Sequence, residues 1–365
     1  MQQPILPKAT TTLVASLWVL GAFPALAQVN PPSVLSQQRN TKELHQLLRQ
    51  GRQYAEAGDY ARAIALYQQA ANLDSQNAKI FSGIGYLYVL QGNFPEAAKA
   101  YQQAIALDPN NANFYHALGY SLANAGDIAN AAIAYQRSVE IQPKNIRNYL
   151  GLGVVRLRQG DYDGAIEACQ RAIALSANNP ETYELMGTAL LKQGKPQQAL
   201  QFLQTASAKF PNNSDLRLQL AKAWIGQGDL DAGLQTLQEV EQLNPKNPLI
   251  QFKIGRILQE KQDLSAALQA YQRAVSLKPN FIEAQAEIAK ILLVQQDYLM
   301  AIVTYRNLIE LAPQNPEHYY NLGVALKARE RNAEATQILN KARELYLSQG
   351  NSEGVKQVEV LLKKL

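Results

Sequence analysis

Small residues recur at a fixed spacing of 34 positions through most of this chain of 365 residues. The first set of glycines and alanines is Gly51, Gly85, Gly119, Gly153, Gly187, Ala221, Gly255, Ala289 and Gly323. The second set follows the first by 12 positions and is Ala63, Ala97, Ala131, Ala165, Ala199, Gly233, Ala267, Ala301 and Ala335. Chance does not place small residues so regularly, so the chain is an array of equal units.

The unit from Ala78 to Asn111 indicates how each repeat folds. Both of its halves carry apolar or small residues at steps of three and four, which predicts two amphipathic helices. Gly92 and Asn93 interrupt the pattern, because glycine can end a helix in the left-handed conformation and asparagine caps the helix that follows. We expect small Gly85 and Ala97 to let the two helices approach closely.

This pattern resembles the tetratricopeptide repeat family, whose period is 34 residues, and the resemblance covers the chain from residue 44 onward. It implies an all-α fold, a right-handed α-solenoid superhelix of tandem helix-turn-helix repeats whose first helices line a concave groove. With helices packed about 10 Å apart, the groove is on the order of 90 Å long, enough for an extended segment of about 25 residues. The nine predicted repeats are 44–77, 78–111, 112–145, 146–179, 180–213, 214–247, 248–281, 282–315 and 316–349.

The turns inside the repeats fall into two groups. The first six contain Gly58, Gly92, Gly126, Gly160, Gly194 and Gly228. The last three have Gln262, Gln296 and Glu330 at the same position, which leaves the geometry of these turns open.

Residues 350–365 follow the last repeat and predict a C-terminal capping helix. One face of that helix is apolar and consists of Val355, Val358, Leu361, Leu362 and Leu365. The last repeat of an array exposes an apolar face unless another element covers it.

The N-terminal 27 residues have the pattern of a secretory signal peptide. Lys8 precedes an apolar run over residues 13–23, and Ala25 and Ala27 form a small-x-small cleavage signature. We expect cleavage after Ala27 and export to a periplasm, a thylakoid lumen or the extracellular space; the alternative is a membrane anchor that is not cleaved. Residues 28–43 are expected to form a linker, in which Asn40 or Thr41 could cap the first repeat helix.

Composition and residue positions give no support for catalysis. The 35 basic residues only slightly outnumber the 30 acidic ones, so we expect no nucleic-acid partner. His45, His116 and His318 fall in the first, third and ninth repeats and cannot converge on Cys169. Cys169 occupies a bulky core position, where a buried, inert thiol is expected. We therefore predict no enzyme activity, no cofactor and no metal site.

Two groups of groove-facing residues are candidates for binding a protein. The first, here called the tyrosine patch, is Tyr86, Val89, Tyr120, Leu150, Val154 and Leu157. Exposed apolar and aromatic residues often mark contact with another protein, although the same residues could be packed between repeats. The second, here called the basic ladder, is Lys222, Arg256 and Lys290. It could bind an acidic partner, or it could be a solvated face paired with Glu283 and Glu287.

These observations predict an exported, non-enzymatic scaffold that binds a protein segment in its groove, in the assembly of an envelope or lumenal complex. The alternative is a structural or oligomeric component that associates through its ends or its convex face. The sequence identifies neither the partner nor the oligomeric state.

Overall fold

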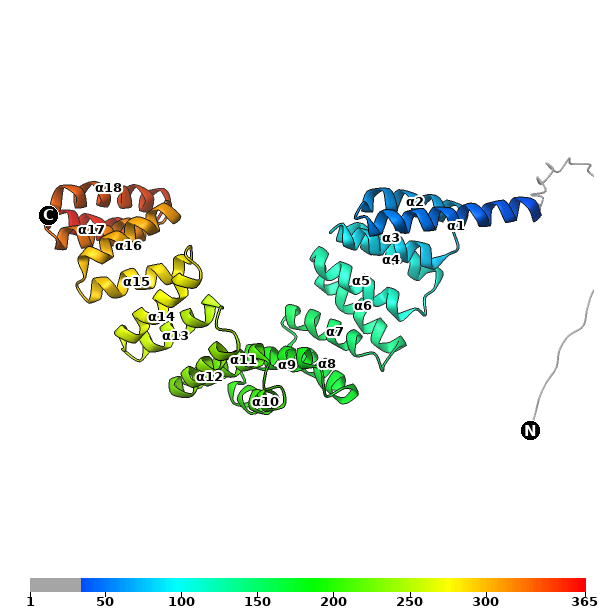
Figure 1. The fold of residues 1–365 in the computed structure, drawn as a ribbon, viewed down its shortest axis with the longest axis horizontal. Coiled ribbons are helices and arrows are strands. Elements are labelled where there is room, and N and C mark those ends of the chain that lie inside the picture. Colours follow the sequence, from blue (N-terminus) through cyan, green and yellow to red (C-terminus); the bar gives the residue numbers. More distant parts are fainter. Residues whose placement is uncertain (1–33) are drawn as a thin grey trace, which may run out of the picture. The chain divides into compact units, whose positions relative to one another are not determined.

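The computed structural model describes residues 34–365, with side chains from residue 39 onward. This part of the chain is an all-α solenoid, as predicted, and contains nineteen helices and no strand (Figure 1). The helices are α1 (Val34–Glu56), α2 (Tyr60–Leu73), α3 (Ala78–Leu90), α4 (Phe94–Leu107), α5 (Ala112–Ala125), α6 (Ile128–Ile141), α7 (Ile146–Gln159), α8 (Tyr162–Leu175), α9 (Pro180–Lys192), α10 (Pro196–Lys209), α11 (Ser214–Gly226), α12 (Leu230–Leu243), α13 (Pro248–Glu260), α14 (Leu264–Leu277), α15 (Ile282–Val294), α16 (Tyr298–Leu311), α17 (Pro316–Ala328), α18 (Asn332–Ser348) and α19 (Ser352–Leu362).

Asparagine and aspartate side chains set the start of most helices. Asn77 Oδ1 accepts a hydrogen bond from the backbone N–H of Lys79 at 3.2 Å, and Asp127 Oδ1 accepts one from Asn130 at 3.2 Å. Such caps satisfy backbone donors that a helix leaves unpaired in its first turn. The eight helices with odd numbers from α3 to α17 begin at the residues where the second to ninth repeats are predicted to begin, and seven of them follow an asparagine cap; α15 follows Phe281.

The chain divides into two compact units, with the boundary between Ser75 and Gln76. In the first unit, α1 packs against α2. The helix α1 begins at Val34, so residues 34–43 are helical rather than a linker, and Asn40 and Thr41 lie inside the helix. The reason is that no glycine or proline interrupts the sequence between Pro32 and Gly51. The signal peptide and the start of the linker lie outside the described residues.

In the second unit, α3 to α19, each helix packs against the next one along the chain (Figure 1). Close approach at the small residues explains the 34-residue pattern. A Cβ atom added at Gly85, Gly119 or Gly255 would lie 2.9 Å or less from the ring of a tyrosine in the following helix. The rings belong to Tyr101, Tyr135 and Tyr271. Close-packed interiors leave no space for such an atom, so these positions require glycine.

The nine turns inside the repeats share one backbone conformation. The six turn glycines have positive φ angles, and Gln262, Gln296 and Glu330 have φ angles of 65°, 64° and 58°. The hydrogen bond that closes the turn is also the same: the backbone N–H of Asp127 donates to the Leu122 carbonyl and that of Asp263 to the Leu258 carbonyl, both at 2.9 Å. The last three turns therefore keep the geometry of the others without glycine.

The predicted C-terminal helix is α19, which packs against α18. Val358 is completely buried in a cluster that contains Tyr346 and Leu345 of α18. Gly354 lies so close to Tyr346 that an added Cβ would meet the ring at 2.5 Å. The apolar face of α19 therefore covers the end of the array, as its sequence indicates.

Candidate protein-binding face

The exposed residues of the first helices from α3 to α17 form what we call the first-helix face. Tyr86, Tyr120 and Val154 occupy the same position in α3, α5 and α7, and their exposed fractions are 57%, 45% and 37%. The preceding residue in each helix is a buried glycine. One residue advances a helix by about 100°, so burial of the glycine turns its neighbour away from the second helix.

The rest of the tyrosine patch is half-buried. Val89 packs against the core residues Ala97 and Tyr101, while Leu150 and Leu157 are of intermediate exposure. The six predicted residues thus consist of three exposed side chains and three half-buried ones, of which Val89 packs against the core. The alternative, in which the whole patch is packed between repeats, does not describe Tyr86, Tyr120 and Val154.

Sequence reasoning missed residues that support the patch. Phe94, the first residue of α4, packs edge-to-face against Tyr120 with ring centroids 6.2 Å apart. His116 Nδ1 lies 3.1 Å from Oδ1 of buried Asn148, whose Nδ2 donates to the Ser138 carbonyl at 3.1 Å. These contacts join α5, α6 and α7. A polar residue at a core position of α7 was the available signal for Asn148.

Burial keeps two tyrosines and one histidine next to the patch uncharged. Burial raises the pKa of Tyr101 and of Tyr135 to about 12, with smaller contributions from Tyr86 and Tyr120 respectively. Burial also lowers the pKa of His116, which outweighs the opposite effect of its hydrogen bond to Asn148. Near neutral pH these three side chains beside the patch are therefore uncharged.

The basic ladder does not behave as one unit. Lys222, Arg256 and Lys290 are all exposed, at the same position of α11, α13 and α15. Lys290 Nζ forms an ion pair with Glu287 Oε1 at 3.1 Å, so the solvated, paired interpretation applies to this residue. Lys222 and Arg256 instead line one pocket, together with Lys253, which the sequence analysis did not single out.

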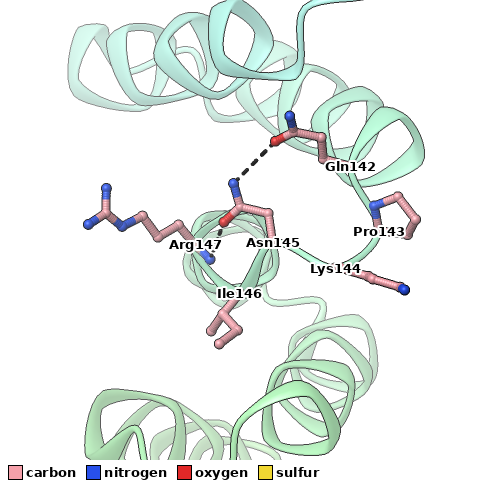
Figure 2. A pocket seen from close by; sticks show the side chains of 6 residues that line it. All are labelled: Gln142, Pro143, Lys144, Asn145, Ile146 and Arg147. Atoms are coloured by element: carbon pink, nitrogen blue, oxygen red, sulfur yellow. Dashed lines mark hydrogen bonds between the residues drawn. The ribbon is translucent and has the colours of Figure 1, made fainter.

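One hollow in the described residues has no site chemistry. It has a volume of about 740 Å³ and is lined by residues 142–147, which are the connection between α6 and α7 and the first two residues of α7. Asn145 Nδ2 donates to Gln142 Oε1 at 3.3 Å, which orders the loop. Figure 2 shows Lys144 and Arg147 pointing to opposite sides of the loop, so their charges do not converge. It is a surface depression beside a turn.

The residues considered for catalysis stay apart. Cys169 is 1% exposed, so the predicted burial of its thiol is confirmed, and burial raises the pKa of this thiol to about 12. Among the residues that the structure describes, no three His, Cys, Asp or Glu side chains gather in a way that could hold a metal ion. Over the same residues, no helix combines the length and the hydropathy needed to cross a bilayer.

Three family models match the chain. The model of the C-terminal domain of cilia and flagella-associated protein 70 matches residues 21–249, a tetratricopeptide repeat model matches residues 225–282, and a TPR repeat model matches residues 289–329. The chain belongs to the tetratricopeptide repeat family. More than half of this tetratricopeptide repeat protein falls within the first match. No curated protein sequence matches it.

Solved tetratricopeptide repeat structures resemble the chain in fold. A tetratricopeptide repeat protein from Parabacteroides merdae is 13% identical, and the match covers 69% of this chain and 99% of that one with a TM-score of 0.53. MamA is 24% identical over 46% of this chain and 92% of its own, with a TM-score of 0.45. YrrB, a TPR protein with an unusual peptide-binding site, is 24% identical over 51% and 96%, with a TM-score of 0.41.

Proposed function

We propose that this tetratricopeptide repeat protein is an exported, non-enzymatic scaffold that holds a segment of another protein on its first-helix face. The observation that supports this most directly is the row of Tyr86, Tyr120 and Val154, which is exposed although the residues beside it are buried. Apolar and aromatic surface is costly to leave in water, and tyrosine is enriched where proteins bind one another. Assembly of an envelope or lumenal complex is the role we assign to it.

Export is part of the proposal and is supported by the sequence of residues 1–27. The compartment is a periplasm, a thylakoid lumen or the extracellular space. Mass spectrometry of the protein isolated from its cells tests this directly. A mature N-terminus at Gln28 is expected, and an intact N-terminus would favour the uncleaved anchor.

The function is tested by affinity capture from envelope extract with residues 28–365. The bait is compared with a Tyr86→Ala/Tyr120→Ala variant, which should lose the partner and keep the circular dichroism spectrum, because both rings are largely exposed. Ile133→Ala is the matched control, since Ile133 is an exposed apolar residue on the second helix α6. Equal retention of every partner by all three baits would contradict binding through the patch.

One observation favours the alternative, association through the face of the second helices. Leu299, Met300 and Val303 of α16 are exposed and adjacent, with Val294 exposed just before them. Changing the three α16 residues to Ser should leave the first-helix face intact. Loss of partner or of self-association in this variant, with no effect of the Tyr86→Ala/Tyr120→Ala change, would establish the alternative function.

A further inference from the structure

The outer face of α16 is apolar where the second helices of the other repeats are polar or carry small residues. Leu299, Met300 and Val303, here called the α16 patch, are 63%, 48% and 45% exposed and lie three and four positions apart on one helix face. At the equivalent positions of the other eight repeats, the only large aliphatic or aromatic residue is Ile133. The fold of a repeat therefore does not require these residues, and an exposed apolar patch confined to one repeat indicates a contact with another chain.

Charged residues border the α16 patch at both of its ends. At the start of α16, Asp297 Oδ1 accepts a hydrogen bond from the backbone N–H of Met300 at 3.2 Å. None of the ion pairs within the described residues includes Asp297. Beyond the patch, Arg306 and Arg331 both pair with the single carboxylate of Glu334. The patch thus has an unbalanced negative charge at one end and an unbalanced positive charge at the other.

The spacing of these residues fits a contact of α16 with a second copy of itself. When two identical helices pair antiparallel about a two-fold axis, residues at equal distances on either side of the axis face one another. The midpoint between Asp297 and Arg306 is also the midpoint between Met300 and Val303. One axis therefore brings Met300 of each copy to Val303 of the other, and Asp297 to Arg306. The opposite charges and the apolar residues are satisfied by the same arrangement.

The neighbouring second helices are compatible with such a contact. The residues of α14 and α18 at the positions of Leu299 and Val303 are exposed and uncharged, and they are Ser265, Gln269, Ala333 and Gln337. A two-fold contact places each surface against its own copy, so a rim with one sign of charge would repel itself. In α8 the same positions carry two acids, Asp163 and Glu167, which would repel in this way.

We propose that two copies of this chain pair through the α16 patch, with α16 antiparallel to α16 of the second copy. Met300 packs against Val303 across the contact, and Asp297 pairs with Arg306 at each end. This inference goes beyond the proposed function, because the contact uses second helices and leaves the first-helix face of both copies free. The dimer presents two binding faces, and its small apolar centre makes it a weak one.

Sedimentation equilibrium of the full-length protein tests the pairing, in a concentration series from about 1 to about 300 µM that covers weak association. The average mass should rise from one chain to two. A monomer throughout the series would overturn the proposal, and a mass that continues to rise above two chains would overturn the closed two-fold contact. A monomeric wild type whose captured partner is lost in Val303→Asp would assign the patch to a different protein and overturn self-pairing.

Three variants separate the patch from general association. Val303→Asp should weaken the dimer about 100-fold, because it places two unpaired carboxylates in the apolar contact, and should keep the circular dichroism spectrum because Val303 is exposed. Gln201→Asp, at the same exposed position of α10, is the matched control and should not change dimerisation. Asp297→Asn keeps a residue that caps α16 but removes the charge, so it should weaken the dimer about 3- to 10-fold. Wild-type association in Val303→Asp would overturn the patch.

Disulfide formation tests the antiparallel arrangement. In a mixture of Met300→Cys and Val303→Cys chains, mild oxidation should link the two variants to each other faster than it links either variant to itself. Cys169 is buried and does not compete. Faster linking of each variant to itself would indicate a parallel pair and overturn the arrangement.

The two faces are distinguished by exchanging the assays. Tyr86→Ala/Tyr120→Ala should dimerise like wild type, and Val303→Asp should retain a partner that is captured on the first-helix face. Loss of dimerisation in the tyrosine variant would place self-association on the first-helix face and overturn pairing through α16, whatever the outcome of the capture experiment.

Discussion

At the residue scale, the three turns without glycine place residues that have a Cβ atom in a backbone conformation that favours glycine. Gln262, Gln296 and Glu330 have positive φ angles, which bring the Cβ atom of an L-residue close to its own backbone. All three side chains are exposed. Their conformation is therefore imposed by the helices on either side and by the closing hydrogen bond rather than by side-chain contacts.

Replacing Gln262 with Gly should stabilise the protein by about 0.5–1 kcal/mol, because removal of the Cβ strain outweighs the extra entropy of an unfolded glycine. The free energy of unfolding in urea measures this. Gly92→Ala is the converse control: at a φ of 78° it should lower stability by about 1 kcal/mol. A loss of stability in Gln262→Gly would show that the strain assigned to this turn is absent.

At the element scale, six of the nine helix pairs have a close approach between a glycine of the first helix and a bulky residue of the second. In two repeats the bulky residue is a leucine rather than a tyrosine: Gly187 lies against Leu203 and Gly323 against Leu339. The bulky side chains differ and the spacing does not, because the contact requires only a small residue on the first helix, which is alanine at Ala221 and Ala289. The sequence could predict the contact for this reason, without predicting the rotamers.

The last element, α19, should be required for stability. Deleting residues 353–365 would expose Tyr346 and Leu345 at the end of the array. It should lower the free energy of unfolding by several kcal/mol, since each buried apolar side chain contributes about 1.5–3 kcal/mol. Thermal denaturation and gel filtration test this, and an unchanged melting curve with a monodisperse sample would defeat it.

A matched pair of substitutions isolates the contact from the truncation. Val358 is fully buried and Val360, on the same helix, is 53% exposed. Val358→Asp should destabilise strongly because it buries an unpaired charge, while Val360→Asp should change stability by no more than about 0.5 kcal/mol.

At the scale of the whole molecule, the second unit has no single core. Its buried residues form successive clusters, each drawn from neighbouring repeats. One cluster contains Ala97, Tyr101 and Leu118, and another, far along the chain, contains Leu339 and Tyr346. Because each repeat stabilises mainly its neighbours, stability should vary along the chain rather than be lost everywhere at once.

Hydrogen exchange on a Leu339→Ala variant tests this property. Leu339 is fully buried, and its truncation should cost about 2–5 kcal/mol. Amide protection should fall first in α17, α18 and α19, while α3 to α6 keep the protection seen in wild type. An equal loss of protection along the whole unit would mean that the array unfolds as one cooperative block.

The sequence also predicted much of the candidate site, because a fixed period transfers one helix orientation to every repeat. Tyr86, Tyr120 and Val154 could be assigned to an outer face in this way. The side chains that contact or pair with those outer residues could not be predicted from the sequence. Lys290 is paired and Lys222 is not, although both occupy the same position of the repeat.

The sequence by itself determined the period, the order of the helices and the places where they turn, since these depend on caps, turn residues and small residues that act within one repeat. The packing of Phe94 on Tyr120, and the position of Lys253 beside two ladder residues in one pocket, depend on the tertiary structure alone. Both involve side chains that meet from different helices, with distances and exposures that a periodic pattern does not encode. These contacts between side chains of different helices determine the chemistry of the binding face, and they differ from one repeat to the next.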